Sequence, residues 1–214
     1  MPSTYRRFLL VRDNFYSDPD SVRRIAQSMK YQESDDVTGY MTEQAYQPTG
    51  VRQRLEQILG VKITDWDVDP PQGNGIFYGG FSIGTHKEAP GVHFDEPEDQ
   101  ITIVIYLTPD LPCDSGTSMW QHKPTGLMNS PTPTDARRLK MPLAQLQHRL
   151  EADSNRPDRW IEVDRAGYRY NRMVAYASGM LHSATRHYGG NLRHGRLYQT
   201  FRVGVNWSTF RVYA

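Results

Sequence analysis

The sequence predicts a mainly β protein with supporting helices, in the class of jelly-roll and cupin-like double sheets. Two observations carry this prediction. Segments with helical periodicity fall within the first 60 residues, whereas short alternating or apolar segments, bounded by turn residues, follow one another from residue 61 to residue 207. Many short strands with regular turn signals are typical of β-sandwiches and barrels. At 214 residues the chain fits one domain with a proper core, so we expect 1–214 to be a single domain.

The first 60 residues contain the expected helical support. Residues 17–29 begin with a capping residue, a proline in the first turn and early acids, and apolar residues then recur at helical spacing. Residues 51–59 predict a second amphipathic helix, which Gly60 ends in the C-cap role. A short strand is expected at 7–12, and 31–50, polar and aromatic without a period, predict a long loop.

From residue 61 onward the sequence pattern is mainly that of β-strands. Ile101–Leu107 is the most apolar of them and predicts a core strand. The pair Gly79-Gly80 interrupts an aromatic segment and indicates a bulge or a close backbone approach. A polar, proline-punctuated insertion at 122–133 leads into a helix expected at 134–152. The other expected strands are 61–68, 76–83, 116–121, 160–163, 172–177, 196–207 and 210–213, with a turn at 70–75.

Composition limits the partners and the compartment. The formal net charge is only +1, which gives no reason to expect a nucleic-acid or membrane partner. Cys113 is the single cysteine, so neither an intramolecular disulfide nor a thiolate zinc cluster is possible within this sequence. No apolar run approaches the roughly 18 residues that span a bilayer, and the first ten residues do not resemble a signal peptide. We expect a cytoplasmic protein.

Two segments far apart in the sequence carry the residues with metal-binding chemistry. His93 and Asp95 lie two residues apart, so on an extended strand both side chains leave the same face. His182 follows a strand and a tight turn at Ser178-Gly179, which can return its side chain toward that pair. Two imidazoles and one carboxylate form the set that holds iron(II) and leaves coordination positions open. Each part alone also fits a structural role, as a solvated strand end or a hydrogen-bonded core histidine.

The remaining histidines are rival ligands. His148 lies in a predicted helix, and His187 and His194 lie in a polar loop, so these rank below the trio. His86 and His122 stay open as alternatives.

The strand that follows His182 in the sequence has one polar face. With a period of two residues, Arg196, Tyr198, Thr200 and Arg202 share a face, and the opposite face is apolar. An inward guanidinium binds a carboxylate through two hydrogen bonds and keeps its charge when desolvated. An amphipathic edge strand with surface arginines is the structural alternative.

The His93/Asp95 pair, the distal His182 and the strand beginning at Arg196 follow one another in this order. Together they resemble the iron(II)- and 2-oxoglutarate-dependent oxygenase superfamily over about 74–207. The segment Asp13–Asp20 also resembles the start of small prolyl-hydroxylase-like bacterial members. The resemblance implies a double-stranded β-helix at 74–207 with a helical insertion at about 134–152 and helical support from 1–60. It implies that His93, Asp95 and His182 hold iron(II), and that Arg196 binds the distal carboxylate of the cosubstrate 2-oxoglutarate.

Further residues of the site follow from the same resemblance. The spacing of Arg196 and Arg202 is similar to that in the alkylation-repair branch, where both arginines meet 2-oxoglutarate, and Tyr106 is a further candidate contact. That branch has an asparagine where Tyr198 stands here, and this chain lacks its basic nucleic-acid face, so we do not expect nucleic-acid repair.

The implied activity is hydroxylation of an unactivated C–H bond with dioxygen as the oxidant. The substrate would be an amino acid, a peptide or a small natural-product intermediate. Asp95 stands where halogenases of the family have a small residue, so hydroxylation, or a related desaturation or cyclisation, is expected instead. Two other functions stay open: a cupin-like metal enzyme that does not use 2-oxoglutarate, and a catalytically silent ligand-binding β-barrel.

Overall fold

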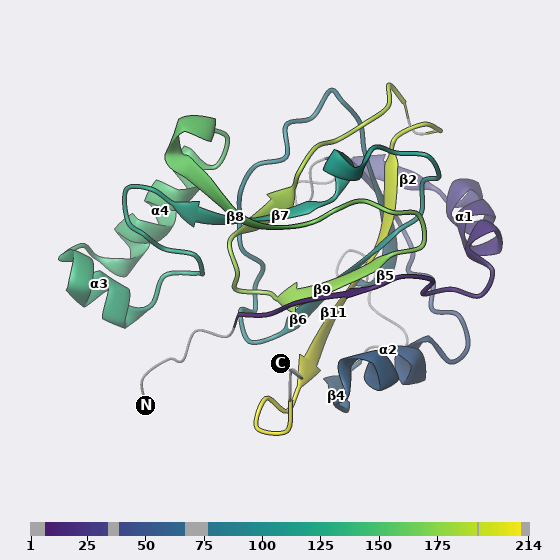
Figure 1. Ribbon diagram of the computed structural model, residues 1–214, viewed down its shortest axis with the longest axis horizontal. Helices are drawn as coiled ribbons and strands as arrows, with labels where there is room; N and C mark the ends of the chain where they lie inside the picture. Colours follow the sequence, from purple (N-terminus) through teal and green to yellow (C-terminus); the bar gives the residue numbers. More distant parts are fainter. Residues whose placement is uncertain (1–6, 34–38, 67–76, 192, 211–214) are drawn as a thin grey trace.

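A computed structural model of the chain describes residues 7–33, 39–66, 77–191 and 193–210. Its strands form two antiparallel sheets, a large one and a small one, as Figure 1 shows. Helices α1 and α2 lie at one end of the molecule, and α3 and α4 lie at the opposite end, beyond the small sheet. The cavity that contains the candidate site is lined from both sheets.

The large sheet has the strand order β1-β9-β6-β11-β5-β3-β2, with β4 paired to β11 outside this order. Its central strand pairs are β6 with β9 and β11 with β5 and β6. Every residue of β6 is buried, which agrees with the continuous apolar sequence of this strand. The bounds are β1 Leu9–Arg12, β2 Tyr31–Glu33, β3 Tyr40–Thr42, β4 Ile63–Asp65, β5 Tyr78–Gly84, β6 Ile101–Tyr106, β9 Met173–Ala177 and β11 Arg196–Val205.

The small sheet has the order β10-β7-β8, formed by His182–Ala184, Thr117–His122 and Trp160–Ala166. Two helices, α3 (Pro133–Leu139) and α4 (Leu143–Asp153), lie in the chain between β7 and β8. Single 3₁₀ turns occupy Cys113–Ser115 and Pro157–Arg159. A small apolar core joins α4 to this sheet and consists of Val92, Leu127, Leu150, Trp160 and Leu181.

The first two helices begin and end as their sequences predict. In α1 (Pro19–Ser28), the Asp18 side chain accepts a hydrogen bond from the Ser21 amide, and the proline occupies the first turn. Helix α2 (Val51–Leu59) ends at Gly60, which has the left-handed φ of 68°. The buried faces of both helices belong to the main core, together with Phe81 and Phe201 of the large sheet.

Gly79 is the bulge that the Gly79-Gly80 pair predicts. Thr200 pairs with Gly80, but Phe201 pairs with Tyr78, so Gly79 is the extra residue in β5. Its φ is +117°, and a Cβ atom there would lie 2.6 Å from the Tyr46 carbonyl oxygen. The position therefore requires glycine both for its backbone conformation and for the close approach.

Three expectations about elements were wrong. The segment 31–50 is not one long loop, because β2 and β3 add two short strands to the edge of the large sheet. The helix expected at 134–152 is two helices, since Lys140 takes a left-handed φ of 52° and Pro142 begins the next helix. His93 and Asp95 lie outside a regular strand, and His93 forms an isolated bridge with His182.

Other expected elements are found only in part, or lie partly outside the described residues. Within the described part of the expected strand, 61–66, a strand covers 63–65, and residues 67–76, with the expected turn, lie outside the described residues. Phe210 is not in a strand, and the rest of 210–213 is also outside them. Across the described ranges, no helix combines the length and the apolar character needed to cross a membrane.

Candidate metal centre

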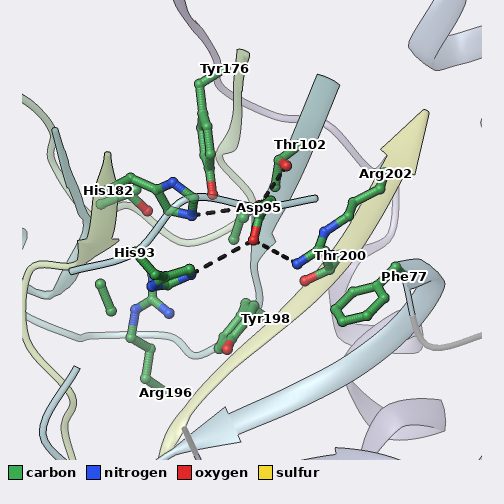
Figure 2. A pocket seen from close by; sticks show the side chains of 13 residues that line it. Phe77, His93, Asp95, Thr102, Tyr176, His182, Arg196, Tyr198, Thr200 and Arg202 are labelled. Carbon is green, nitrogen blue, oxygen red and sulfur yellow. Dashed lines mark hydrogen bonds and ion pairs between the residues drawn. The ribbon is translucent and has the colours of Figure 1, made fainter. Parts of the chain in front are cut away.

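His93, Asp95 and His182 converge on one point, and Figure 2 shows them at the wall of the cavity. One ligand atom from each residue lies within 4.8 Å of those of the other two. His93 Nε2 is 3.7 Å from one carboxylate oxygen of Asp95, and His182 Nε2 is 3.5 Å from the other. The sequence analysis expected this convergence of residues from two distant segments.

Backbone pairing brings the two histidines together. The His93 amide donates to the His182 carbonyl oxygen at 3.0 Å, and the His182 amide donates back to the His93 carbonyl oxygen at 2.8 Å. The imidazole centroids are 4.4 Å apart as a result. The amide of Asp95 donates to the carbonyl oxygen of Ser178, so both ends of the His93–Asp95 segment are held against the chain around His182.

The two imidazoles are oriented in the same way. Nδ1 of His93 is 2.9 Å from the Gly91 carbonyl oxygen, and Nδ1 of His182 is 2.8 Å from the Met180 carbonyl oxygen. A carbonyl oxygen can only accept, so each Nδ1 carries a proton, and each Nε2 is the ring nitrogen that faces Asp95. Hydrogen bonding of the second ring nitrogen is the usual support for metal-binding histidines.

Asp95 is a buried carboxylate with a hydrogen bond to each oxygen. Thr102 donates its hydroxyl to one oxygen at 2.7 Å, and Arg202 donates Nη2–H to the other at 2.6 Å. Burial acts to raise the pKa of Asp95, but its electrostatic coupling to His182, the charge of Arg202 and the Thr102 hydrogen bond outweigh it, so the pKa lies below its ordinary value. The group is ready to act as an anionic ligand.

Burial has the opposite consequence for His182. It lowers the pKa of this imidazole to about 4, although the charge of Asp95 opposes the shift. The ring is neutral near neutral pH, as a metal ligand must be. Two imidazoles and one carboxylate fit the donor set of non-heme iron(II) sites, so the residues present fit the metal predicted from the sequence.

The polar face of β11 lines the same cavity, which has a volume of about 80 Å³. Its lining includes the four residues that the strand period placed on one face: Arg196, Tyr198, Thr200 and Arg202. The apolar face of the strand, with Leu197, Phe201 and Val203, belongs to the main core. The expectation that the polar face turns inward, and not toward solvent, therefore agrees with the structure.

Arg196 is a buried cation whose partners are neutral. Only 2% of its surface is exposed, and its guanidinium donates to the carbonyl oxygens of Ser115 (2.7 Å) and Gly116 (3.1 Å). It also lies over the rings of Tyr106 and Tyr198, at 5.1 and 4.7 Å from the ring centroids. No ion pair within the described part of the chain involves it. A buried guanidinium without an anion favours binding of one.

The structure places Arg202 and Tyr106 differently from Arg196. Arg202 already pairs with Asp95, and its guanidinium lies 3.7 Å from the centroid of the Phe77 ring. The Tyr106 hydroxyl is bonded to the Thr117 hydroxyl at 2.8 Å, and Tyr106 is not among the residues that line the cavity. Burial raises the pKa of Tyr106, which keeps the phenol neutral beneath Arg196. A direct contact of either residue with 2-oxoglutarate stays a prediction.

The rival histidines lie outside the trio. His122 is fully buried between the Thr125 hydroxyl and the Asp153 carboxylate, where it joins β7 to α4. His187 packs against Gly84, so that a Cβ there would meet the imidazole at 2.6 Å. His86 contacts the carbonyl oxygen of Gly189, His194 contacts the nearby Asn191 side chain, and His148 is exposed. Within the described ranges, a metal-binding group of three such residues is found only at His93, Asp95 and His182.

Sequence reasoning missed three residues of the site. Thr102 and Tyr176 are neighbours in the register of β6 with β9, and both line the cavity, together with Phe77. The Tyr176 ring lies 4.5 Å from that of His182, and burial raises its pKa well above the ordinary value. The period of two in β6 places Thr102 and Val104 on one face, but only the pairing with β9 indicates which face the cavity occupies.

Comparison with known proteins places the chain in a family. Residues 3–201 match the family described as "Family of unknown function (DUF6445)". The chain belongs to this family. No curated protein matches the sequence.

Two solved structures of one protein, HygX, share its fold. HygX from Streptomyces hygroscopicus, with nickel and 2-oxoglutarate bound, matches at a TM-score of 0.52 with 13% identity, over 93% of this chain and 83% of HygX. A second HygX structure, which also holds hygromycin B, matches at the same TM-score with 12% identity over the same shares. The Fe(II)/(alpha)ketoglutarate-dependent dioxygenase TqaL matches at only 0.39 with 11% identity, over 96% of this chain and 86% of TqaL. The likeness to HygX confirms the predicted double-stranded β-helix class.

Proposed function

We propose that this DUF6445 member is an iron(II)- and 2-oxoglutarate-dependent oxygenase. Three features support the proposal. His93, Asp95 and His182 form a converging set of two imidazoles and a carboxylate. A buried arginine without an anionic partner shares their cavity. The fold is that of HygX, a protein whose structure holds nickel and 2-oxoglutarate.

The cosubstrate assignment rests on Arg196, which is buried in the cavity without an anionic partner. A metal trio alone would suit a cupin-like enzyme that does not use 2-oxoglutarate, but such an enzyme leaves a buried guanidinium without a function. Arg196 is held by two backbone carbonyls and two aromatic rings, so its position is fixed before any ligand binds. A dicarboxylate could reach from this guanidinium to a metal ion at the trio within the one cavity.

Each residue then has a separate task. His93, Asp95 and His182 would hold the metal, and Thr102 and Arg202 would keep Asp95 ionised and oriented. Arg196 would bind the distal carboxylate of 2-oxoglutarate. When bound, iron(II) and 2-oxoglutarate supply with dioxygen the oxidising power for C–H hydroxylation, or for a related desaturation or cyclisation. The two sheets and their aromatic side chains would limit the access of water to this reaction.

The substrate proposal is coarser. We propose an amino acid, a peptide or a small natural-product intermediate, and HygX offers one instance, since one of its structures holds hygromycin B. The single-domain organisation, cytoplasmic location and lack of a nucleic-acid partner stay predictions of the sequence.

Calorimetric titration of the nickel(II)-loaded protein with 2-oxoglutarate tests the cosubstrate assignment. Nickel prevents turnover, so binding is measured alone. We expect wild type to bind one equivalent, and Arg196→Met to weaken 2-oxoglutarate binding by about tenfold or more, because a charge-assisted pair is lost. Nickel binding itself should change little.

Arg24→Met is the matched control, because Arg24 is exposed on α1. The assignment fails if wild type binds nickel but not 2-oxoglutarate. It also fails if Arg196→Met and Arg24→Met bind 2-oxoglutarate equally well.

A further inference from the structure

Tyr176 of β9 is the buried tyrosine of the cavity whose hydroxyl has no partner. Only 2% of its surface is exposed, yet no hydrogen bond joins its hydroxyl to another residue that the structure describes. Other buried tyrosines behave differently. The Tyr106 hydroxyl bonds to Thr117, and the Tyr168 hydroxyl donates to the Thr108 carbonyl oxygen. Buried tyrosine hydroxyls usually find a partner, so the exception calls for an explanation.

The hydroxyl faces the cavity and not the protein interior. Tyr176 lines the cavity. Its hydroxyl oxygen has no partner and is not fully buried. Figure 2 shows the ring descending from β9 with its hydroxyl directed toward the space beside His182 and Asp95. Arg196 lies on the other side of the trio in the same view. A ligand in this cavity would therefore meet the two residues at different places along its wall.

Two contacts fix the position of Tyr176. It packs against the His182 imidazole at 4.5 Å between centroids, with an angle of 52° between the planes. Its backbone pairs with Thr102, the residue that donates to Asp95. Its hydroxyl therefore has a defined place relative to both His182 and Asp95, and a phenol at neutral pH can donate a hydrogen bond there.

We propose that the Tyr176 hydroxyl donates a hydrogen bond to a small ligand bound at the metal position, beside His182 and Asp95. The ligand atom would be an electronegative one that accepts, such as an oxygen of 2-oxoglutarate or of the dioxygen-sized molecule that shares the site. This inference rests on the proposed function, because it assumes a metal at the trio. It adds a ligand-contacting residue that the sequence analysis did not consider.

Tyr176→Phe is the direct test, since it removes the hydroxyl and keeps the ring against His182. The protein is loaded anaerobically with iron(II), titrated with 2-oxoglutarate and then with nitric oxide, which stands in for dioxygen. We expect the affinity for at least one of these two probes to fall about five- to tenfold, the usual effect of one lost hydrogen bond. Iron affinity and thermal stability should stay close to those of wild type.

Tyr170→Phe is the matched control, because the Tyr170 hydroxyl donates to Asp20 on the surface and lies outside the cavity. The inference is overturned if both probe affinities of Tyr176→Phe stay within twofold of the control. It is also overturned if iron affinity falls in parallel, because Tyr176 would then act only by orienting His182. Failure of the proposed function looks different: wild type itself would bind no iron, or would bind iron without 2-oxoglutarate.

Discussion

At the scale of single residues, the electrostatic surroundings of Asp95 distinguish this site from a chance cluster. A carboxylate that is 5% exposed costs much free energy to ionise unless cations and donors surround it. Arg202 and Thr102 provide one hydrogen bond to each oxygen. Arg202 itself is enclosed between Asp95 and the Phe77 ring, so its charge is only partly screened by solvent.

Loss of Arg202 should therefore change the pH range of metal binding. In Arg202→Met, the pKa of Asp95 rises because a positive charge is removed while the burial remains. A larger fraction of Asp95 is then protonated at a given acidic pH, so metal affinity should begin to fall at a higher pH than in wild type. Nickel(II) affinities measured between pH 7 and pH 4 would reveal the shift. Superimposable profiles for Arg202→Met and wild type would show that Arg202 does not tune this carboxylate.

His187 should make the metal-free protein sensitive to acid. Burial, with a smaller contribution from the charge of Arg196, lowers its pKa to about 4, below the ordinary value of 6.5. Between these two values the unfolded chain takes up a proton that the folded chain refuses, so this contribution to stability is present above pH 6.5 and is lost as the pH falls toward 4.

Urea unfolding of metal-free protein at pH 7, 6 and 5 measures this loss. We expect His187→Gln to lose less unfolding free energy over that range than wild type, and His148→Gln, a change of an exposed histidine, to match wild type. His182 has the same direction of shift and should contribute to the dependence that remains. Equal slopes for His187→Gln and wild type would rule out His187 as a source.

At the scale of elements, the insertion between β7 and β8 is part of the site's support. Val92 and Leu181, the residues just before the two histidines, belong to the small core with Leu150 of α4. At the end of that helix, the Ser154 hydroxyl donates to the Val92 carbonyl oxygen, and the Val92 amide donates to the Ser154 carbonyl oxygen. Helix α4 and Ser154 thus support both histidine-bearing segments.

Leu150→Ala should consequently reduce stability and metal affinity together. Deleting a buried leucine side chain typically costs about 2–5 kcal/mol, and the cavity that results adjoins Val92 and Leu181. Urea unfolding and nickel(II) titration measure the two effects, with Glu151→Ala, an exposed position of the same helix, as the control. A large loss of stability with unchanged metal affinity would separate the small core from the site.

Gly79 offers a second test at this scale. Gly79→Ala places a methyl group at 2.6 Å from the Tyr46 carbonyl oxygen at a φ of +117°, so β5 must lose its bulge or move. We expect a loss of several kcal/mol in the unfolding free energy, on the order of other strained backbone substitutions. At Gly60, φ is also positive but nothing lies within 4 Å of a Cβ, so Gly60→Asn should cost far less. Similar losses for the two variants would refute the steric argument.

Local signals predicted the elements whose first and last residues, or whose apolar sequence, mark them clearly. Asp18 and Pro19 begin α1, Gly60 ends α2, and the apolar run at 101–107 forms β6. The failures have long-range causes. Residues 31–33 and 40–42 are strands only because they extend the edge of the large sheet, which no local period reveals. The break at Lys140 had a local signal in Pro142, which the helical spacing of the leucines obscured.

At the scale of the whole molecule, the site depends on contacts between distant segments. The mutual bonds of His93 with His182 span 89 residues, and Arg202 meets Asp95 across the cavity. Sequence order and residue type sufficed to select the trio and the inward face of β11. They could not reveal that Arg202 pairs with Asp95 or that Tyr176 faces the cavity, since both facts depend on the register of the large sheet.

The proposed function requires one cavity to hold iron(II) and 2-oxoglutarate together. The most direct measurement is anaerobic addition of iron(II) and then 2-oxoglutarate, with the visible absorption followed for the weak charge-transfer band of the chelate. It requires no knowledge of the substrate. We expect the band in wild type and its loss in His182→Ala, with both proteins folded. Tight iron binding without a band would contradict the oxygenase assignment, and no iron binding at all would contradict the metal centre itself.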